Sequence, residues 1–150
     1  MQRVISNLNE WIYIVEQECM YMFEEDVSKR PALNKWSQKE VLGHLCDSAV
    51  NNLTRFIKIQ YEAQPFILTT YKQEEWVDLQ GYEDMPIEEI VQLWCSLNRK
   101  IVRAIGKIPS EKLAYQSVTS DGELVTLEWL IEDYVAHMEQ HLKKQIFICS

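Results

Sequence analysis

Long stretches of apolar residues at a helical spacing dominate this sequence. Only four glycines and four prolines occur among its 150 residues, so few positions favour a turn. The periodicity predicts amphipathic helices over residues 3–24, 38 to about 61–63, about 87–105 and 127–146. Four such helices, with longer second and third connections, predict an all-α fold: an up-down four-helix bundle with short excursions between helices. We expect it to form one domain over residues 1–150.

Particular residues mark where these helices begin and end. Ser37 and Glu40 fit a capping box, in which a hydroxyl and a carboxylate three residues later bond to the free N–H groups at a helix start. Pro86 is expected in the first turn of the third long helix, Gly106 at its end, and Thr126 at the cap of the last helix. Between the long helices, the sequence predicts a short helix over 71–79, one helical turn over 110–113 and a tight turn at 121–122.

The charge and the cysteines limit the compartment and the partners. The formal net charge is −8, which disfavours nucleic acid and anionic membranes as partners. No apolar run is long enough to cross a bilayer, and the first residues do not resemble a secretory signal. The four cysteines, Cys19, Cys46, Cys95 and Cys149, form no CxxC pair. They are expected to be buried free thiols of a cytoplasmic protein, with terminal Cys149 as the exception.

All three histidines of the chain fall within two of the predicted helices. His137 and His141 are four residues apart, so they stack on one helix face with Cβ atoms about 5–6 Å apart. A helical wheel places both on the inward half of the last helix, beside Leu130 and Tyr134. This spacing fits a two-point site for zinc or a similar ion. It also fits two histidines at the edge of the core that are satisfied by hydrogen bonds.

The third histidine belongs to a polar stripe on the second long helix. The stripe consists of Ser37, His44, Ser48, Asn51 and Arg55. Such a stripe is either a solvated face or the wall of a cleft, where it would supply a metal ligand and hydrogen-bonding groups. If the two helices face each other, the imidazole nitrogens of His44, His137 and His141 should converge at about 2.0–2.1 Å from one ion.

Three neutral imidazoles leave a tetrahedral ion with one open position, which is the pattern of a catalytic site. That position is expected to take water, whose pKa the ion would lower toward about 7. Asp47, three residues after His44, is the alternative fourth ligand. Glu40, Asp47 and Asp133 are candidate hydrogen-bond acceptors for the second nitrogen of a ligating ring, with an exposed position on a helix as the alternative for each.

Two segments that carry the histidines resemble the metal motifs of the DinB-like superfamily. Residues 36–48, followed by Asn52 and the Arg55-Phe56 pair, are similar to the first motif, and residues 126–142 are similar to the second. Gln64-Pro65, residues 71–76 and residues 122–127 resemble the middle of the YfiT-like branch. That branch is described as metal-dependent hydrolases and includes bacillithiol transferases. The resemblance implies a three-histidine site with zinc or nickel, and often a homodimer.

We therefore expect a metal-dependent enzyme that uses one divalent transition metal ion, zinc first and nickel second. The expected reaction is thiol S-transfer or hydrolysis on a small molecule, with a low-molecular-weight thiol as a partner. Asn51, Arg55 and Tyr134 are expected to orient the substrate, with Arg55 binding a carboxylate. A surface ion pair is the alternative role for Arg55. The excursions over 66–85 and 109–125 should lie near the mouth of the site.

Two other classes of function fit the same sequence. A non-catalytic metal-binding stress protein would keep the ligands without an accessible cleft. A metal-free helical interaction module would fold without any ion.

Overall fold

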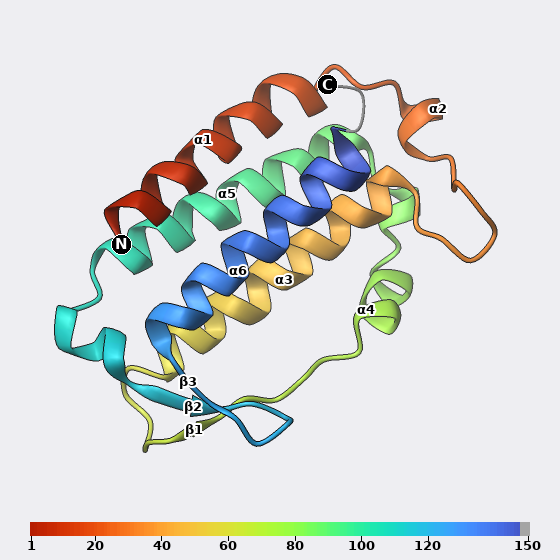
Figure 1. Cartoon of the computed structure of the whole chain (residues 1–150). Helices are drawn as coiled ribbons and strands as arrows, with labels where there is room; N and C mark the ends of the chain where they lie inside the picture. Colours follow the sequence, from red (N-terminus) through yellow and green to blue (C-terminus); the bar gives the residue numbers. More distant parts are fainter. Residues whose placement is uncertain (148–150) are drawn as a thin grey trace.

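The four predicted long helices lie side by side in the computed structural model, which describes residues 1–147 (Figure 1). They are α1 (Gln2–Cys19), α3 (Gln38–Lys58), α5 (Ile87–Gly106) and α6 (Leu127–His141). The predicted all-α four-helix bundle is confirmed. Cys149 lies outside the described residues. Within the described part of the chain, no helix is sufficiently long and apolar to span a bilayer.

The order of the helices in space differs from their order in the sequence. Helix α5 packs against both α1 and α3, and α6 packs against α3 on the other side of the bundle. Figure 1 shows α1 and α6 running in one direction and α3 and α5 in the other, so the path is not a strict up-down alternation. The predicted contact between the second and fourth long helices is present, because α3 and α6 are neighbours.

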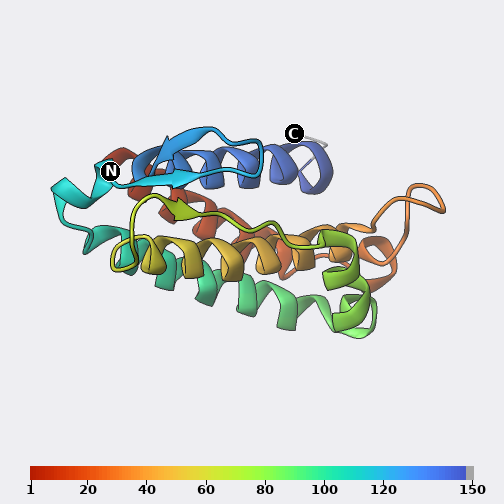
Figure 2. The same ribbon diagram turned by 90° about the horizontal axis from the view of Figure 1, so that it is seen from below.

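A small sheet closes one end of the bundle, and the sequence analysis did not predict it. It contains β1 (Phe66–Ile67), β2 (Gln116–Val118) and β3 (Leu124–Thr126), in the order β1-β2-β3. Strand β2 is parallel to β1 and antiparallel to β3, with Ser117 opposite both Phe66 and Val125. Figure 2 shows β1 beside α3, and β2 and β3 beside α6. Strands of two or three residues are too short to produce a readable alternation.

The remaining elements are short and lie in the connections. They are α2 (Glu24–Val27), α4 (Gln73–Gln80), the 3-10 turns η1 (Tyr82–Asp84) and η2 (Ser110–Ala114), and a π-helical segment η3 (Leu142–Ile146) that continues α6. The short helix, the helical turn and the tight turn predicted in the excursions are present. Gly122 adopts a positive φ of 85° in the turn between β2 and β3, a conformation that glycine takes without steric cost.

The predicted caps are confirmed at α3 and α6. Ser37 and Glu40 form the complete capping box, and the Thr126 hydroxyl accepts a hydrogen bond from the backbone N–H of Trp129. Pro86 immediately precedes α5 instead of lying inside its first turn. Helix α3 ends at Lys58, a few residues before the predicted end, and α6 changes to π geometry after His141.

The first helix is shorter than the predicted range 3–24 because Glu24 has another role. The chain leaves the helix after Cys19, and the Glu24 carboxylate accepts hydrogen bonds from Lys39 Nζ and from the backbone N–H of Ile87. The bond from Ile87, followed by that from Lys39, lowers the pKa of Glu24. A carboxylate there satisfies a free N–H at the start of α5, so Glu24 ties the first connection to two long helices.

Apolar side chains from all four long helices form the core. Fully buried examples are Leu8, Leu42, Leu45, Phe56, Ile90, Trp94, Ile101 and Ile131. Cys19, Cys46 and Cys95 are free and buried, as the sequence predicts for these three. Gly43 allows a close approach: a Cβ atom there would lie 2.4 Å from the ring of Tyr82. This glycine brings η1 directly against the first half of α3.

Candidate metal centre

The three histidines converge in the space between α3 and α6. His44 comes from the first half of α3, and His137 and His141 come from the last turns of α6. One ring nitrogen from each lies within 4.8 Å of the other two. The Nε2 atoms of His137 and His141 are 3.2 Å apart. Two ligands at tetrahedral angles and about 2.0–2.1 Å from one zinc ion are about 3.4 Å apart, so this pair is spaced for a common ion.

Two neighbouring side chains orient the rings. Gln145 Oε1 lies within hydrogen-bonding distance of His141 Nδ1. If Nδ1 carries the proton, the lone pair on Nε2 is free for a metal ion. The ring of Trp36 packs against His44, with 5.0 Å between ring centroids. His44 is 1% exposed, and its Nδ1 has no hydrogen-bond partner among residues 1–147. A buried nitrogen without a partner is costly, and a bound cation is one way to satisfy such an imidazole.

Burial favours the neutral form of two of the three imidazoles, those of His44 and His137. Burial lowers the pKa of His44 to about 4, and the neighbouring His141 and His137 act in the same direction. Burial also lowers the pKa of His137, with His141 adding to the effect and Asp133 opposing it. Metal ions bind the neutral form of imidazole, so the folded chain favours the protonation state that a metal site requires.

The three carboxylates predicted near the ligands have different positions. Both Glu40 and Asp47 are buried rather than exposed. Glu40 accepts from Arg30 and from the backbone N–H of Ser37. Asp47 Oδ1 accepts from the Tyr82 hydroxyl at 2.6 Å and from Gln80 Nε2 at 2.7 Å.

Neither Glu40 nor Asp47 belongs to the histidine cluster in the described part of the chain. The alternative of Asp47 as a fourth ligand is therefore wrong for this conformation, because its carboxylate is held by α4 and η1. Asp133 is the member of this set that lies near a histidine, since its charge raises the pKa of His137.

A cavity of about 240 Å³ adjoins His137 on one side of the cluster. We call it the arginine cavity. Its walls include Ser48, Asn52 and Arg55 from α3, Tyr71 and Gln73 from the first excursion, and Asp133 and His137 from α6. Arg55 is half-buried and donates to the backbone carbonyl of Thr69. No carboxylate lies within ion-pair distance of Arg55 among residues 1–147, so the alternative of a surface ion pair is absent there.

The other two predicted substrate contacts are placed differently. Tyr134 lines the arginine cavity, but its hydroxyl donates to Asn98 Oδ1 at 2.6 Å inside the core. Asn51 donates to the backbone carbonyl of Asp47 on its own helix and is not part of the cavity wall. Asn52, one residue later, occupies the wall instead. Neighbouring residues point about 100° apart around a helix, so the cavity wall lies to one side of the predicted stripe, where it includes Asn52 and not Asn51.

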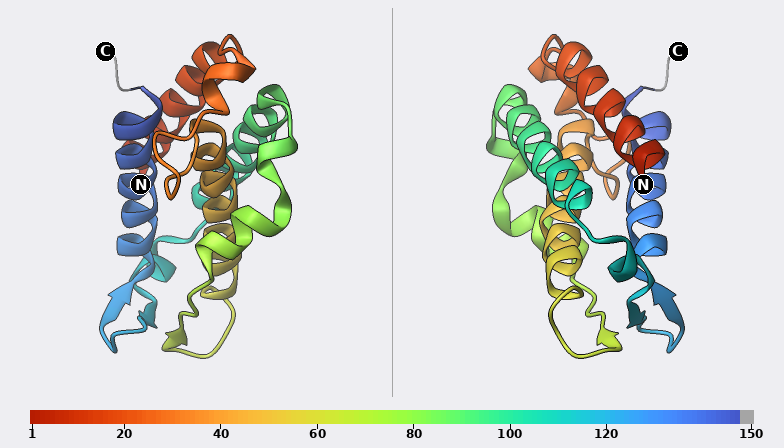
Figure 3. Two further views of the ribbon diagram at one scale, coloured as in Figure 1. Left: turned by 90° about the vertical axis from the view of Figure 1, so that its right-hand side faces the viewer. Right: turned by 90° about the vertical axis from the view of Figure 1, so that its left-hand side faces the viewer.

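Only one of the two excursions lies beside the histidines. Residues 70, 71 and 73 line the arginine cavity, as predicted for the first excursion. The second excursion runs through β2 and β3 into the start of α6, whereas His137 and His141 lie at the other end of that helix. Its predicted place near the mouth is therefore wrong. The segment over 26–38 takes that position, which Figure 3 shows as the orange loop beside the end of α6.

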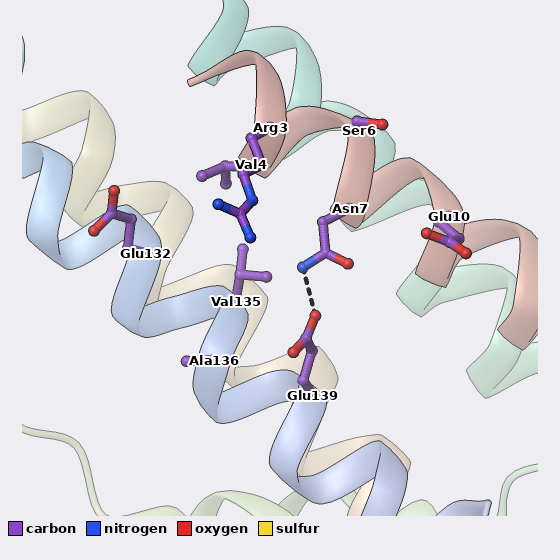
Figure 4. A pocket seen from close by; sticks show the side chains of 9 residues that line it. All are labelled: Arg3, Val4, Ser6, Asn7, Glu10, Glu132, Val135, Ala136 and Glu139. Carbon is purple, nitrogen blue, oxygen red and sulfur yellow. Dashed lines mark hydrogen bonds between the residues drawn. The ribbon is translucent and has the colours of Figure 1, made fainter.

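A larger groove lies between α1 and α6, on another side of α6 (Figure 4). It measures about 640 Å³, and its polar walls include Arg3, Asn7, Glu10 and Glu132. Asn7 donates to the Glu139 carboxylate across the groove, and Trp11 Nε1 donates to the same oxygen. No histidine lines this groove. We choose the candidate site by the convergence of the imidazoles and not by the size of a cavity. The groove between α1 and α6 is therefore not the candidate site.

Comparison with known proteins identifies the family. The profile of the DinB superfamily matches residues 22–144, which include all three histidines and both helices that carry them. The chain belongs to the DinB superfamily. This confirms the resemblance carried by the two histidine motifs.

Related sequences carry a common description. A "putative metal-dependent hydrolase" of Halalkalibacterium halodurans is 28% identical over 119 residues, which are 79% of this chain and 68% of that protein. A protein of Oceanobacillus iheyensis with the same description is 22% identical over 149 residues, which cover 90% of this chain and 85% of its relative.

Solved structures share the DinB fold of this chain. YfiT from Bacillus subtilis, described as a probable metal-dependent hydrolase with an unusual four-helix bundle topology, aligns with a TM-score of 0.85 and 21% identity. The alignment covers 96% of this chain and 82% of YfiT. A mycothiol-dependent maleylpyruvate isomerase aligns with a TM-score of 0.75 and 8% identity, over 97% of this chain and 60% of the isomerase. At these identities the likeness concerns the fold.

Proposed function

We propose that this protein is a metal-dependent enzyme that acts on a small molecule, with His44, His137 and His141 as the ligands of one divalent transition metal ion. The observation that carries the proposal is the convergence of three imidazoles from two helices to within 4.8 Å. The described metal dependence of the relatives from H. halodurans and O. iheyensis supports it.

The donor set fits zinc first and nickel second. Neutral imidazoles suit both ions, and zinc accepts four ligands without a geometric preference from its d electrons. Three protein ligands leave one coordination position for water or a substrate, as in catalytic zinc sites. The arginine cavity borders His137, so a small molecule bound there would lie beside one of the three proposed ligands. This arrangement favours an enzyme over a protein that uses the ion for stability alone.

The bound ion would supply a Lewis acid that activates water or a thiol and polarises a substrate carbonyl. The chain's own residues bind and orient the substrate. The Arg55 guanidinium has no carboxylate partner among residues 1–147. It is suited to a substrate carboxylate because its planar fork can bind both oxygens. The Asn52 and Gln73 amides line the same cavity and offer further hydrogen bonds. Asp133 is the nearby carboxylate that could accept a proton.

Thiol S-transfer is the reaction we favour, with hydrolysis as the second candidate. In the transfer, the thiol sulfur forms a bond to an electrophilic carbon, the leaving group departs with its bonding electrons, and the thiol proton passes to the leaving group or to solvent. The mycothiol dependence of the isomerase with the same fold supports a thiol cosubstrate. In hydrolysis, water would add across the cleaved bond instead.

The chain's described cysteines do not provide that thiol. Burial raises the pKa of Cys46 well above its usual value, and that of Cys95 to about 11. Cys19 is also buried, and its pKa is raised to about 12. A thiol held in its protonated form is a poor nucleophile. The reactive sulfur should therefore belong to a separate low-molecular-weight thiol.

The buried free thiols also support a cytoplasmic location. A homodimer stays a prediction.

Cobalt substitution tests the proposal directly. Untagged protein is stripped of metal, loaded with Co²⁺, and titrated with 2-mercaptoethanol while its absorption spectrum is recorded. A thiol that coordinates the ion should produce a thiolate-to-cobalt charge-transfer band, and Arg55→Met should keep that band while it weakens binding of a carboxylate-bearing electrophile. A cobalt spectrum that no thiol changes would leave hydrolysis as the remaining reaction. Failure to bind Co²⁺, Zn²⁺ or Ni²⁺ would overturn the proposal as a whole.

A further inference from the structure

The arginine cavity contains two side chains of opposite charge that do not pair with each other. Arg55 on α3 and Asp133 on α6 both line its wall. Neither lies within ion-pair distance of an opposite charge among residues 1–147. Burial lowers the pKa of Arg55, with the neighbouring Tyr71 acting in the opposite direction, because the guanidinium loses solvent there without gaining a carboxylate. A ligand that carries both charges would complement such a cavity.

Asn52 adds a hydrogen-bond acceptor to the same wall. Its amide nitrogen donates to the backbone carbonyl of Ser48 at 2.8 Å and to the Ser48 hydroxyl at 3.3 Å. Because the nitrogen is used in this way, the carbonyl oxygen of the amide is the atom that can bond to a ligand in the cavity. An ammonium group has three N–H donors and no acceptor. The Asn52 oxygen therefore suits an ammonium, as does the Asp133 carboxylate.

The positions of these residues along the two helices give their order. His44 and His141 face each other, with 5.1 Å between ring centroids, and α3 and α6 run in opposite directions (Figure 1). Asn52 is eight residues after His44, and Asp133 is eight residues before His141. Both therefore lie about 12 Å from the histidines along the helix axes. Arg55 is three residues further along α3, or about 4.5 Å. The acceptors Asn52 and Asp133 thus lie between the histidines and the guanidinium.

We propose that the arginine cavity binds the head group of an amino acid, and that the electrophilic substrate carries this head group. Arg55 binds the carboxylate, and Asp133 and Asn52 bind the ammonium. The side chain extends along the α3–α6 interface toward His137, one helical turn from Asp133, so the electrophilic carbon belongs to the side chain. This proposal rests on the proposed metal-dependent function, and it adds the charge and the orientation of the substrate. In this complex Asp133 is the ion-pair partner of the ammonium, and this role replaces that of proton acceptor.

Calorimetry on metal-free protein tests the head-group site separately from the metal. The probes are L-norvaline, valerate and butylamine. Valerate is norvaline without the ammonium, and butylamine is norvaline without the carboxylate. Norvaline should bind about fivefold more tightly than valerate, because a charge pair with the exposed Asp133 is weak. It should bind at least about tenfold more tightly than butylamine, which has no carboxylate for the half-buried Arg55.

Two variants assign the two charges of the head group. Arg55→Met should weaken norvaline binding by at least about tenfold and leave butylamine binding unchanged. Asp133→Asn should lower the affinity for norvaline to that for valerate, and valerate should bind equally well or better because a repelling charge is gone. The control Glu132→Gln removes the same charge from the next residue, which lines the groove between α1 and α6. It should keep the preference for norvaline.

Cobalt-loaded protein tests the orientation of the side chain. L-glutamate γ-hydroxamate carries the amino-acid head group on a side chain that ends in a metal-binding hydroxamate, and acetohydroxamate carries the hydroxamate alone. The first compound should change the cobalt absorption spectrum at a lower concentration than the second. Arg55→Met should lose this preference while it keeps its metal content. Equal concentrations for the two compounds in the wild-type protein would overturn the proposed orientation.

The outcomes separate this proposal from the proposed function. Absence of norvaline binding, or equal affinity of the wild-type protein for norvaline and valerate, would overturn the head-group site. A preference for norvaline that Asp133→Asn and Glu132→Gln reduce equally would overturn it as well. Norvaline binding that depends on Arg55 and Asp133, in a protein that takes up no metal, would contradict the proposed function and leave the head-group site intact.

Discussion

The two sides of helix α3 differ in composition and in what they contribute. On one side, Leu42 and Cys46 are buried, and the Cys46 thiol contacts the backbone of Ile90 on α5. On the other side, His44 meets the histidines of α6, and Ser48 lines the arginine cavity. The apolar side fills its space with side chains, whereas the polar side leaves a cavity beside His137.

The two sides of α3 therefore have different roles. The apolar side stabilises the fold, and the polar side carries the groups proposed to bind the metal ion and the substrate. Each fully buried aliphatic side chain contributes about 1.5–3 kcal/mol, so the apolar sides of the long helices are sufficient to hold the bundle. The polar side can then keep groups that do not pack well, such as His44 Nδ1, which has no hydrogen-bond partner in the described part of the chain. We therefore expect the fold to form without the ion. Variants on the apolar side of α3 should lower stability and keep metal binding, whereas variants at the metal ligands should lose metal binding and keep the fold.

The largest expected effect on stability comes from the apolar side. Leu42→Ala should lower the free energy of unfolding by about 2–5 kcal/mol, because Leu42 is 1% exposed and its removal leaves a cavity. Metal stoichiometry should stay unchanged in the folded variant. Urea denaturation and elemental analysis measure the two quantities. Val50→Ala, at a position on the same helix that is 40% exposed, is the control and should change stability by about 0.5 kcal/mol or less. A folded Leu42→Ala protein that binds no metal would show that the two sides are not independent.

A smaller effect should appear in the metal-free protein as the pH falls. The unfolded chain protonates His44 below its ordinary pKa of 6.5, whereas the folded chain resists protonation until about pH 4. Stability should therefore be fully present above pH 6.5 and decline between 6.5 and 4, by about 2 kcal/mol from pH 7.5 to 5. Carboxylates with lowered pKa, such as Glu40, lose their contribution at lower pH. Chemical denaturation across this range measures the decline, which His44→Gln should reduce, and the part that remains is expected from His137, whose pKa is lowered as well. An unchanged decline in that variant would assign it to other groups.

The smallest effect concerns the side chain that orients His141. Gln145→Ala should weaken metal binding by about tenfold, the low end for loss of a hydrogen-bond partner to a ligating histidine, because Gln145 is exposed. Competition with a chromophoric chelator measures this affinity. Gln140→Ala is a matched control, since it removes an exposed amide from the same helix near the ligands. Equal affinities for the two variants would mean that Gln145 does not fix the ring of His141.

The sequence predicted the parts of the fold that depend on periodicity and local hydrogen bonding. The four long helices follow from their apolar spacing, and the caps at Ser37 and Thr126 follow from the hydroxyl beside each helix start. The small sheet was missed because its strands are two or three residues long and gain their pairing from distant segments. The early end of α1 depends on Glu24, whose partners Lys39 and Ile87 lie far away in the sequence.

The candidate site was predicted in part for similar reasons. The convergence of the histidines follows from two helices that face each other, and Arg55 follows from its place on the polar stripe. Asn51 and Asn52 could not be separated, because the direction of a side chain depends on the rotation of the helix against its neighbours. Gln145 had a readable signal that was not used: it lies four residues after His141, the spacing of stacked side chains on a helix. The cavity between the segment over 26–38 and the end of α6 combines a loop with a helix end, and no local pattern indicates that pairing.

The most direct test of the metal centre is to remove one ligand and measure metal content and helical structure together. Untagged wild-type protein and His137→Ala are purified without added chelator and loaded with Zn²⁺. Bound metal is then measured by elemental analysis and helical content by far-UV circular dichroism. The account predicts about one ion per wild-type chain, little or none in the variant, and nearly equal helical content, because burial of apolar side chains holds the bundle. Equal metal content in the two proteins would contradict the three-histidine site. Unfolding of the variant on metal loss would make the ion structural.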